Sequence, residues 1–259
     1  MTNNNYLKHL STLKTLILVL ILVMMLTGCG ENKNSYIFVV DLTQSVSGEA
    51  KNKAFEAIKK QAQKLKRGDS ITVIPLNGDA VTETSGNVIR LQVSERREAF
   101  DADLKKFAAE VGQRLTEMQV NTSAKTYKQT DLFGALRVAH DEVAVTEKEN
   151  RKFFLIVLSD LVQSTKEIRF EKDAIFQKTE TAKKYAEKVS QGRETEWRGV
   201  QVYLGLLQST DLQQMPGERR EAVREFWQEF FRLSGTERYQ FATDGIGQLP
   251  KFIDFSGKS

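Results

Sequence analysis

Short apolar stretches alternate along this chain with longer stretches in which apolar residues recur every three or four positions. The first kind is typical of strands buried on both faces, and the second of helices with one buried face. We predict strands at residues 36–40, 70–76, 87–93, 152–158, 200–207 and 239–242. We predict helices at residues 51–65, 94–115, 131–145, 174–189, 219–233 and 246–255.

This succession of strands and helices predicts an α/β fold, a doubly wound and mainly parallel six-stranded sheet with helices on both faces. Residues 87–93 alternate apolar and polar side chains after a turn at 77–79, which predicts an antiparallel edge strand. The aromatic residues of 226–231 repeat at helical spacing, which favours a core position for them. About 220 residues suit one such domain.

The N-terminus has the pattern of an export signal. Residues 16–26 are 11 apolar residues without a break, preceded by Lys8 and Lys14. A helix that spans the bilayer needs about 20 such residues, so this run is short for a membrane span and has the length of a signal-peptide core. The alternative is an uncleaved anchor helix.

The residues after this run, Leu-Thr-Gly-Cys at 26–29, resemble the lipobox of bacterial lipoproteins. The resemblance implies that residues 1–28 are a signal peptide and that Cys29 is diacylated and becomes the N-terminus. Residues 29–35 then form the lipidated Cys and a short tether, and 36–255 form the domain. Gly30 follows this Cys and, by resemblance to a known sorting rule for lipoproteins, permits sorting to the outer membrane.

Composition excludes several classes of protein. Hydrophobic residues are 40% of the chain, which excludes wholesale disorder. Loss of Lys8 and Lys14 with a signal peptide reduces 38 basic residues to 36, against 34 acidic ones, and such a small excess argues against a nucleic-acid partner. One Cys excludes internal disulfides, and two His residues, of which His140 alone follows the signal, argue against nucleophilic catalysis.

The candidate chemistry lies in loops that follow strands, because ligands of open α/β sheets bind beyond the carboxyl ends of the strands. Asp41, Thr43 and Ser45 follow the first strand at alternate positions, and Asp160 follows the strand at 152–158. Thr130 stands at the start of the helix predicted next to it. Carboxylate and hydroxyl oxygens suit hard cations such as Mg²⁺ or Mn²⁺.

These residues together resemble the von Willebrand factor type A (VWA) domain. Residues 41–45, Asp-x-Thr-x-Ser, are similar to the family's Asp-x-Ser-x-Ser after the first strand. Thr130 resembles its second metal loop and Asp160 its third, and the order of strands and helices from 36 to about 255 matches the whole domain.

The resemblance implies a metal-ion-dependent adhesion site (MIDAS). Thr43, Ser45 and Thr130 would offer hydroxyl oxygens to Mg²⁺ or Mn²⁺, Asp41 and Asp160 would supply negative charge, and one position would be left for a partner's Asp or Glu. The sequence departs from the family at position 43, where Thr stands in place of Ser. The β-methyl group of Thr43 restricts its χ1 angle.

The sequence therefore predicts a lipid-anchored, extracytoplasmic module of the bacterial cell envelope that binds an acidic residue of a protein partner and is not an enzyme. The loops at 121–129 and 161–173 are expected to set its specificity. One alternative is a metal-free scaffold in which Asp41 and Thr130 only cap helices. Another is a metal-dependent phosphoesterase or nuclease that uses strand-end carboxylates, namely Asp41, Asp79, Asp160, Asp211 and Asp244.

Overall fold

The computed structural model describes residues 32–76, 78, 87–96, 100–123, 129–146, 151–192 and 195–256. The elements of the folded unit follow the chain in the order β1 (Lys33–Asp41), α2 (Gly48–Ala62), β2 (Ser70–Leu76), β3 (Ile89–Gln92), α4 (Phe100–Ser123), α5 (Leu132–Val145), β4 (Arg151–Ser159), the 3₁₀ helix η1 (Ala174–Gln177), α6 (Thr179–Val189), β5 (Val200–Leu206), α7 (Thr210–Gln214), α8 (Gly217–Leu233), β6 (Arg238–Ala242) and α9 (Leu249–Ser256).

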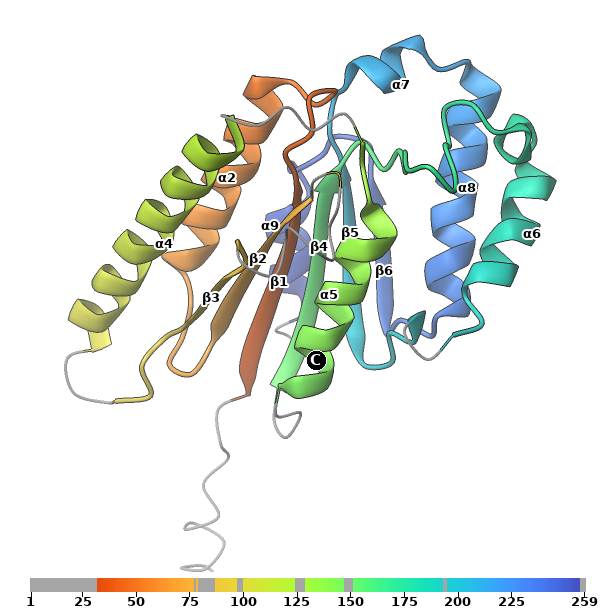
Figure 1. Ribbon diagram of the computed structural model, residues 1–259. Helices are drawn as coiled ribbons and strands as arrows, with labels where there is room; N and C mark the ends of the chain where they lie inside the picture. Colours follow the sequence, from red (N-terminus) through yellow and green to blue (C-terminus); the bar gives the residue numbers. More distant parts are fainter. Residues whose placement is uncertain are drawn as a thin grey trace, which may run out of the picture. The chain divides into compact units, whose positions relative to one another are not determined.

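The six strands form one sheet in the order β3-β2-β1-β4-β5-β6 (Figure 1). All neighbouring strands are parallel except β2 and β3, which are antiparallel, so the predicted sheet and its edge strand are confirmed. The chain moves outward from β1 to β2 and β3 and then returns to place β4 on the other side of β1. The strand order therefore reverses between β1 and β4, which is where open α/β sheets bind ligands.

Helices cover both faces of the sheet, with α5, α6 and α8 on one face and α2, α4 and α9 on the other (Figure 1). Successive residues of β1 point to opposite faces. Ile37 and Val39 pack with the first set of helices, and Phe38 and Val40 pack with the second. Both faces of the central strands are thus buried, which explains why these strands are apolar without alternation.

The aromatic side chains of α8 belong to the core, as predicted. Phe226, Trp227, Phe230 and Phe231 are all 0–1% exposed. Burial of one such side chain contributes about 1.5–3 kcal/mol to folding. His140 packs its ring edge-on against Trp197, with the ring centroids 5.5 Å apart.

Several element boundaries differ from the predicted ones. The helix predicted at 94–115 is α4, Phe100–Ser123, so residues 121–123 of the predicted loop 121–129 are helical. β1 begins at Lys33, which pairs with Arg151 of β4, so residues 33–35 lie in the sheet and not in the tether. The helix predicted at 174–189 is interrupted at Lys178, whose backbone is extended, and becomes η1 and α6. The short helix α7 was not predicted, because five residues are too few to show a periodicity.

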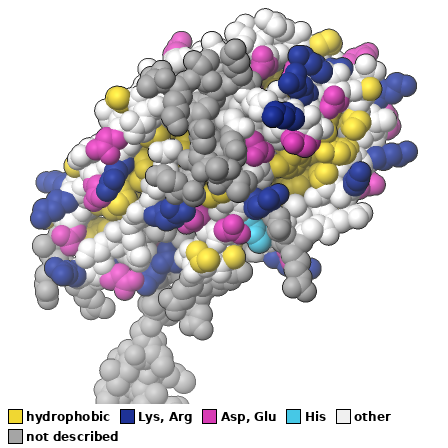
Figure 2. Space-filling model, viewed as in Figure 1, with side chains coloured by type: hydrophobic (Ala, Val, Ile, Leu, Met, Phe, Trp, Pro, Cys, Tyr) yellow, Lys and Arg dark blue, Asp and Glu magenta, His cyan; other side chains and the backbone are white. Residues whose placement is uncertain are grey.

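Acidic and basic side chains are interspersed over the face seen in Figure 2, in keeping with the small net charge. No helix among the described residues combines the length and the apolar character that a membrane span requires. Cys29 and the predicted signal peptide lie outside the described residues.

Candidate functional site

Asp41 and Asp160 lie at the carboxyl ends of the two strands between which the strand order reverses. Asp41 is the last residue of β1, and Asp160 directly follows β4. The two strands are hydrogen-bonded neighbours in which Val40 pairs with Leu158. The predicted adjacency of the two carboxylates is therefore confirmed, and their side chains are 0% and 1% exposed.

Hydroxyl groups connect the two carboxylates. The Thr43 hydroxyl donates to Asp41 Oδ1 at 2.6 Å, and the Thr43 amide donates to the same oxygen at 3.0 Å. The hydroxyls of Thr43 and Ser45 lie 3.3 Å apart, and Ser45 donates to Asp160 Oδ2 at 3.3 Å. Four of the five predicted site residues thus form a continuous chain of hydrogen bonds.

Ser159 is a member of this site that sequence reasoning missed. Its hydroxyl donates to Asp41 Oδ2 at 2.6 Å and accepts from the Leu161 amide at 3.0 Å. Only the register between β1 and β4 places Ser159 beside Asp41, so the sequence pattern alone does not single it out.

The loop after β1 is fixed against the loop after β5. Val46 and Ser209 form an antiparallel bridge, and the Thr210 amide donates to the Ser45 carbonyl at 3.0 Å. Ser209 is 2% exposed, and its hydroxyl also forms a hydrogen bond with the Asp160 carboxylate. No sequence pattern points to Ser209, because it lies 168 positions after Asp41 along the chain.

Thr130 lies beside the Asp160 loop through its backbone. Thr130 and Ser164 exchange two amide-to-carbonyl hydrogen bonds of 2.9 Å each. Among the described residues, no hydrogen bond joins Thr130 to Asp41, Thr43, Ser45 or Asp160.

The residue that caps α5 is Asp131 and not Thr130, since the Asp131 carboxylate accepts from the Gly134 amide at 3.0 Å. Buried Gln163 completes this helix start, because its Oε1 accepts from the Leu132 amide at 2.6 Å and from the Phe133 amide at 3.2 Å. Gln163 ties the start of α5 to the loop that follows Asp160. In α2 the cap is Ser47, so the alternative in which Asp41 and Thr130 serve as helix caps is wrong for both residues.

The backbone at Leu161 is strained. Its φ is 62°, a left-handed conformation that is uncommon for a residue with a branched side chain. Two hydrogen bonds hold this turn, one from the Leu161 amide to Ser159 and one from Trp227 Nε1 to the Leu161 carbonyl at 2.9 Å. The strained turn therefore directly follows Asp160 and is anchored in the core.

Both carboxylates have raised pKa values. Burial raises the pKa of Asp41, against hydrogen bonds from Ser159 and Thr43 and the charge of Lys51. Burial and the nearby Asp41 charge raise the pKa of Asp160, against hydrogen bonds from the Val162 amide and the Ser209 hydroxyl. Two carboxylates buried side by side without a cation destabilise each other's ionised form.

The donor set fits a hard divalent cation. Asp41 and Asp160 form no ion pair with any described Lys, Arg or His, so a bound cation would compensate buried negative charge that no described side chain contacts with an opposite charge. The other candidate donors, Thr43, Ser45 and Thr130, are neutral hydroxyls. Within the described part of the chain, no three His, Cys, Asp or Glu side chains gather at one point.

Among the described strand-end carboxylates, neither Asp211 nor Asp244 forms a group of three acidic side chains with Asp41 and Asp160. Asp211 lies in α7 and contributes its charge to Asp160, and Asp244 follows β6. Asp79 lies outside the described residues.

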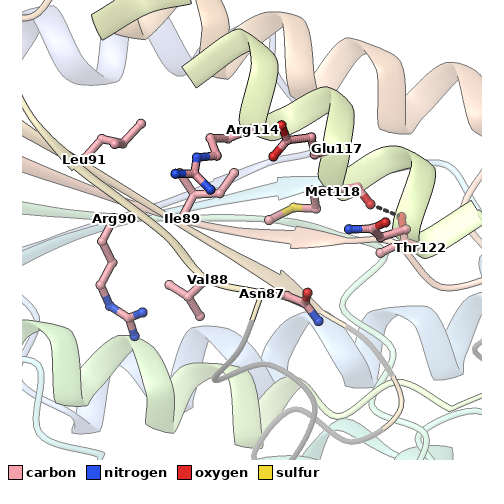
Figure 3. Close-up of a pocket in the computed structure, with 10 residues that line it drawn as sticks. Asn87, Val88, Ile89, Arg90, Leu91, Arg114, Glu117, Met118 and Thr122 are labelled. Carbon is pink, nitrogen blue, oxygen red and sulfur yellow. Dashed lines mark hydrogen bonds between the residues drawn. The ribbon is translucent and has the colours of Figure 1, made fainter. Parts of the chain in front are cut away.

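A separate pocket of about 300 Å³ lies between β3 and α4, at the antiparallel edge of the sheet (Figure 3). Arg114 and Glu117 line it from α4, and the Arg90 side chain turns away to pair with Glu142 of α5. This pocket contains none of the predicted site residues.

The sequence matches no known family and no curated protein. The solved structures that are similar over most of this chain include manganese-loaded TRAP protein of Plasmodium vivax (14% identity, TM-score 0.40, 86% of this chain and 72% of that one). They also include a von Willebrand factor type A protein from Catenulispora acidiphila (13%, 0.40, 88% and 42%) and the pilus adhesin SpaC from Lactobacillus rhamnosus GG (13%, 0.47, 88% and 30%). This chain spans less than half the length of the last two. The similarity is distant, so the candidate site depends on its own geometry.

Proposed function

We propose that this protein is a membrane-tethered, extracytoplasmic binding module of the VWA type that captures an acidic side chain of a protein partner through Mg²⁺ or Mn²⁺. The observation that carries the proposal is the pair of buried carboxylates, Asp41 and Asp160, joined through hydroxyls at the reversal of strand order. Buried charges without a counter-charge are costly, and a cation removes that cost.

Each residue has a distinct task in this proposal. Asp41 and Asp160 supply the negative charge, and Thr43, Ser45 and Thr130 supply neutral oxygens. When bound, the cation would supply positive charge that attracts a partner's Asp or Glu, because the other protein donors are neutral hydroxyls that add no further negative charge. Ser159 orients Asp41, and the Val162 amide orients Asp160 by donating to its Oδ1 at 3.0 Å.

In this proposal the protein binds its partner and catalyses no reaction. His140, the one histidine in the described residues, packs against Trp197 and takes no part in the site. The site itself offers carboxylates and hydroxyls in contact with one another. Such a donor set suits a hard cation, and the cation would attract a partner's carboxylate.

Attachment to the membrane is the second half of the proposal. The lipobox resemblance assigns diacylation to Cys29, and two acyl chains hold a protein on a membrane where one is marginal. β1 begins four residues after Cys29, so the lipid and the fold are separated by a short segment.

Calorimetry with Mn²⁺ tests the metal site in the protein purified in mild detergent. We expect weak binding by the wild type, no binding by Asp41→Ala, and unchanged binding by the control Asp254→Ala, whose side chain is exposed on α9. Absence of binding at millimolar Mn²⁺ would contradict the proposal.

A second candidate function is a scaffold that uses the fold without metal. The observation in its favour is that Thr43, Ser45 and Ser159 already donate hydrogen bonds to the two carboxylates. Partner capture from the cell-envelope extract separates the two functions. Capture that is lost in chelator and in Asp41→Ala supports the metal site, and capture that survives both supports the scaffold.

A further inference from the structure

A groove of about 450 Å³ adjoins the candidate metal site and is lined by residues of α7 and the start of α8. Asp160 and Ser209, which form one wall of the metal site, also line this groove. A ligand group held at Asp160 therefore has the groove directly beside it. The volume lies within the range of about 300–1,000 Å³ that is usual for ligand pockets.

The floor of the groove is apolar. Leu206 from β5, Leu212 from α7 and Phe241 from β6 are partly exposed side chains that pack on the core, and buried Val223 of α8 also lines the groove. Apolar surface that the fold leaves open to solvent gains free energy when a ligand covers it.

The rim of the groove carries a basic residue that forms no ion pair within the described part of the chain. Arg220 of α8 donates to the Leu212 carbonyl at 3.2 Å and forms no ion pair with any described residue. Arg224 and Glu221 also line the groove, but they pair with each other, and Arg224 pairs further with Glu225. Apart from Asp160, which belongs to the candidate metal site, the one charged side chain of the groove without a described ion-pair partner is therefore Arg220.

We infer that this groove, which we call the α7–α8 groove, binds the partner residues that follow the acidic residue bound at the metal site. The inference rests on the proposed function and specifies its partner. The recognised segment is an acidic residue followed by a bulky aliphatic residue, with a second acidic residue beyond it. The first acid lies at the metal site, the aliphatic side chain covers Leu212 and Phe241, and the second acid pairs with Arg220.

Each of the three positions follows from a different observation. Continuity through Asp160 and Ser209 places the first acid next to the groove. The apolar floor selects the aliphatic residue, and the unpaired guanidinium selects the second acid. Loss of the aliphatic contact is expected to weaken binding about tenfold or more.

A bead-bound hexapeptide library with one fixed Glu and all other positions varied tests the inference, with the fluorescently labelled protein in mild detergent as the probe. With Mn²⁺ present, we expect selection of Leu, Ile or Val next to the fixed Glu and of Asp or Glu beyond it. Leu212→Ser should reduce the aliphatic preference at least fivefold, and Arg220→Glu should remove the second acidic preference.

Matched controls are Leu233→Ser, at the far end of α8, and Arg114→Glu, on α4. Both should keep the wild-type preferences. If these controls lose the preferences as strongly as the groove variants do, the assignment to the groove is wrong.

The outcomes separate this inference from the proposed function. Mn²⁺-dependent retention without an aliphatic preference, or a preference that Leu212→Ser leaves intact, overturns the groove and leaves the metal site standing. An aliphatic preference that persists in chelator and in Asp41→Ala, but is lost in Leu212→Ser, supports the groove and overturns the metal site. Absence of retained peptides in Mn²⁺ overturns both.

Discussion

The Ser159 hydroxyl donates a 2.6 Å hydrogen bond to Asp41 Oδ2 and so joins the ends of β4 and β1 at the site. The same oxygen accepts from the Leu161 amide, which begins the strained turn after Asp160. One buried hydroxyl thus holds one carboxylate and the turn that follows the other.

Ser159→Ala is expected to lower the free energy of unfolding by about 1–3 kcal/mol, because it leaves a buried carboxylate oxygen and a buried amide without their partner. It should also weaken Mn²⁺ binding by disordering Asp41. Urea unfolding and calorimetry measure the two effects. The control Ser190→Ala removes an exposed hydroxyl at the end of α6 and should change stability by less than about 0.5 kcal/mol. Equal effects of the two variants would contradict a special role for Ser159.

In chelator, the stability of the wild type is expected to fall as the pH rises from about 4 towards neutrality. The raised pKa of Asp160 means that the folded state retains a proton which the unfolded state, with a carboxyl pKa of about 3.9, has released. Asp41 and Asp211 strengthen this effect on Asp160, and Lys51 acts on Asp41 in the opposite sense.

Asp160→Asn should flatten this pH dependence, and the exposed control Asp254→Asn should retain it. Urea unfolding at a series of pH values provides the measurement. Added Mn²⁺ should oppose the fall in the wild type, because it stabilises the ionised carboxylates. If the free energy of unfolding of the wild type in chelator varied with pH as little as that of Asp160→Asn, burial of this carboxylate would have no measurable effect on stability.

Thr43→Ser is expected to keep or improve Mn²⁺ affinity, since it removes only the methyl group and keeps the hydroxyl that donates to Asp41. Thr130→Ala should weaken Mn²⁺ binding about tenfold, in the range of lost supporting interactions at metal sites. Calorimetry of both variants beside the wild type gives the comparison. Unchanged affinity in Thr130→Ala would remove this residue from the proposed ligands.

Cys29 is expected to be lipidated. Intact-mass analysis of the protein extracted from membranes should show the loss of residues 1–28 and the added mass of acyl chains, and Cys29→Ser should accumulate the precursor. A full-length chain with an unmodified Cys29 would refute the lipobox interpretation.

Gly205→Ala is expected to lower stability by about 1–3 kcal/mol through overpacking. A Cβ at this position of β5 would lie 2.5 Å from the Gly245 carbonyl oxygen and 2.8 Å from Leu158 Cδ2. Gly112→Ala is the matched control, because its Cβ meets nothing within 4 Å in the middle of α4. Helix propensity should make that variant neutral or slightly more stable. Thermal unfolding of the two variants should therefore shift in opposite directions or differ clearly in size.

The sequence was sufficient to predict the sheet and the meeting of Asp41 with Asp160. Unbroken apolar stretches identify buried parallel strands, and the topology of such sheets brings the first and fourth strands together. These are rules of chain connectivity, so they do not depend on the details of packing.

The positions of the residues that support the two carboxylates do depend on the details of packing. Ser159 reaches Asp41 only because Val40 pairs with Leu158. Ser209 is held at the site by backbone hydrogen bonds between the loop after β5 and the loop after β1. Gln163 caps α5 from another loop, which no local pattern reveals. The interruption at Lys178 was missed for a similar reason, because apolar spacing continues across a residue whose backbone is extended.

The hydrogen bond from Trp227 to the Leu161 carbonyl gives this protein an optical probe of its own site. The chain has two tryptophans, so Trp197→Phe leaves one indole, buried and bonded to the residue after Asp160. The emission of that indole depends on the polarity and hydrogen bonding around it. Occupancy of the site by a cation or a peptide should therefore be readable as a change in intrinsic fluorescence, without a label on either partner.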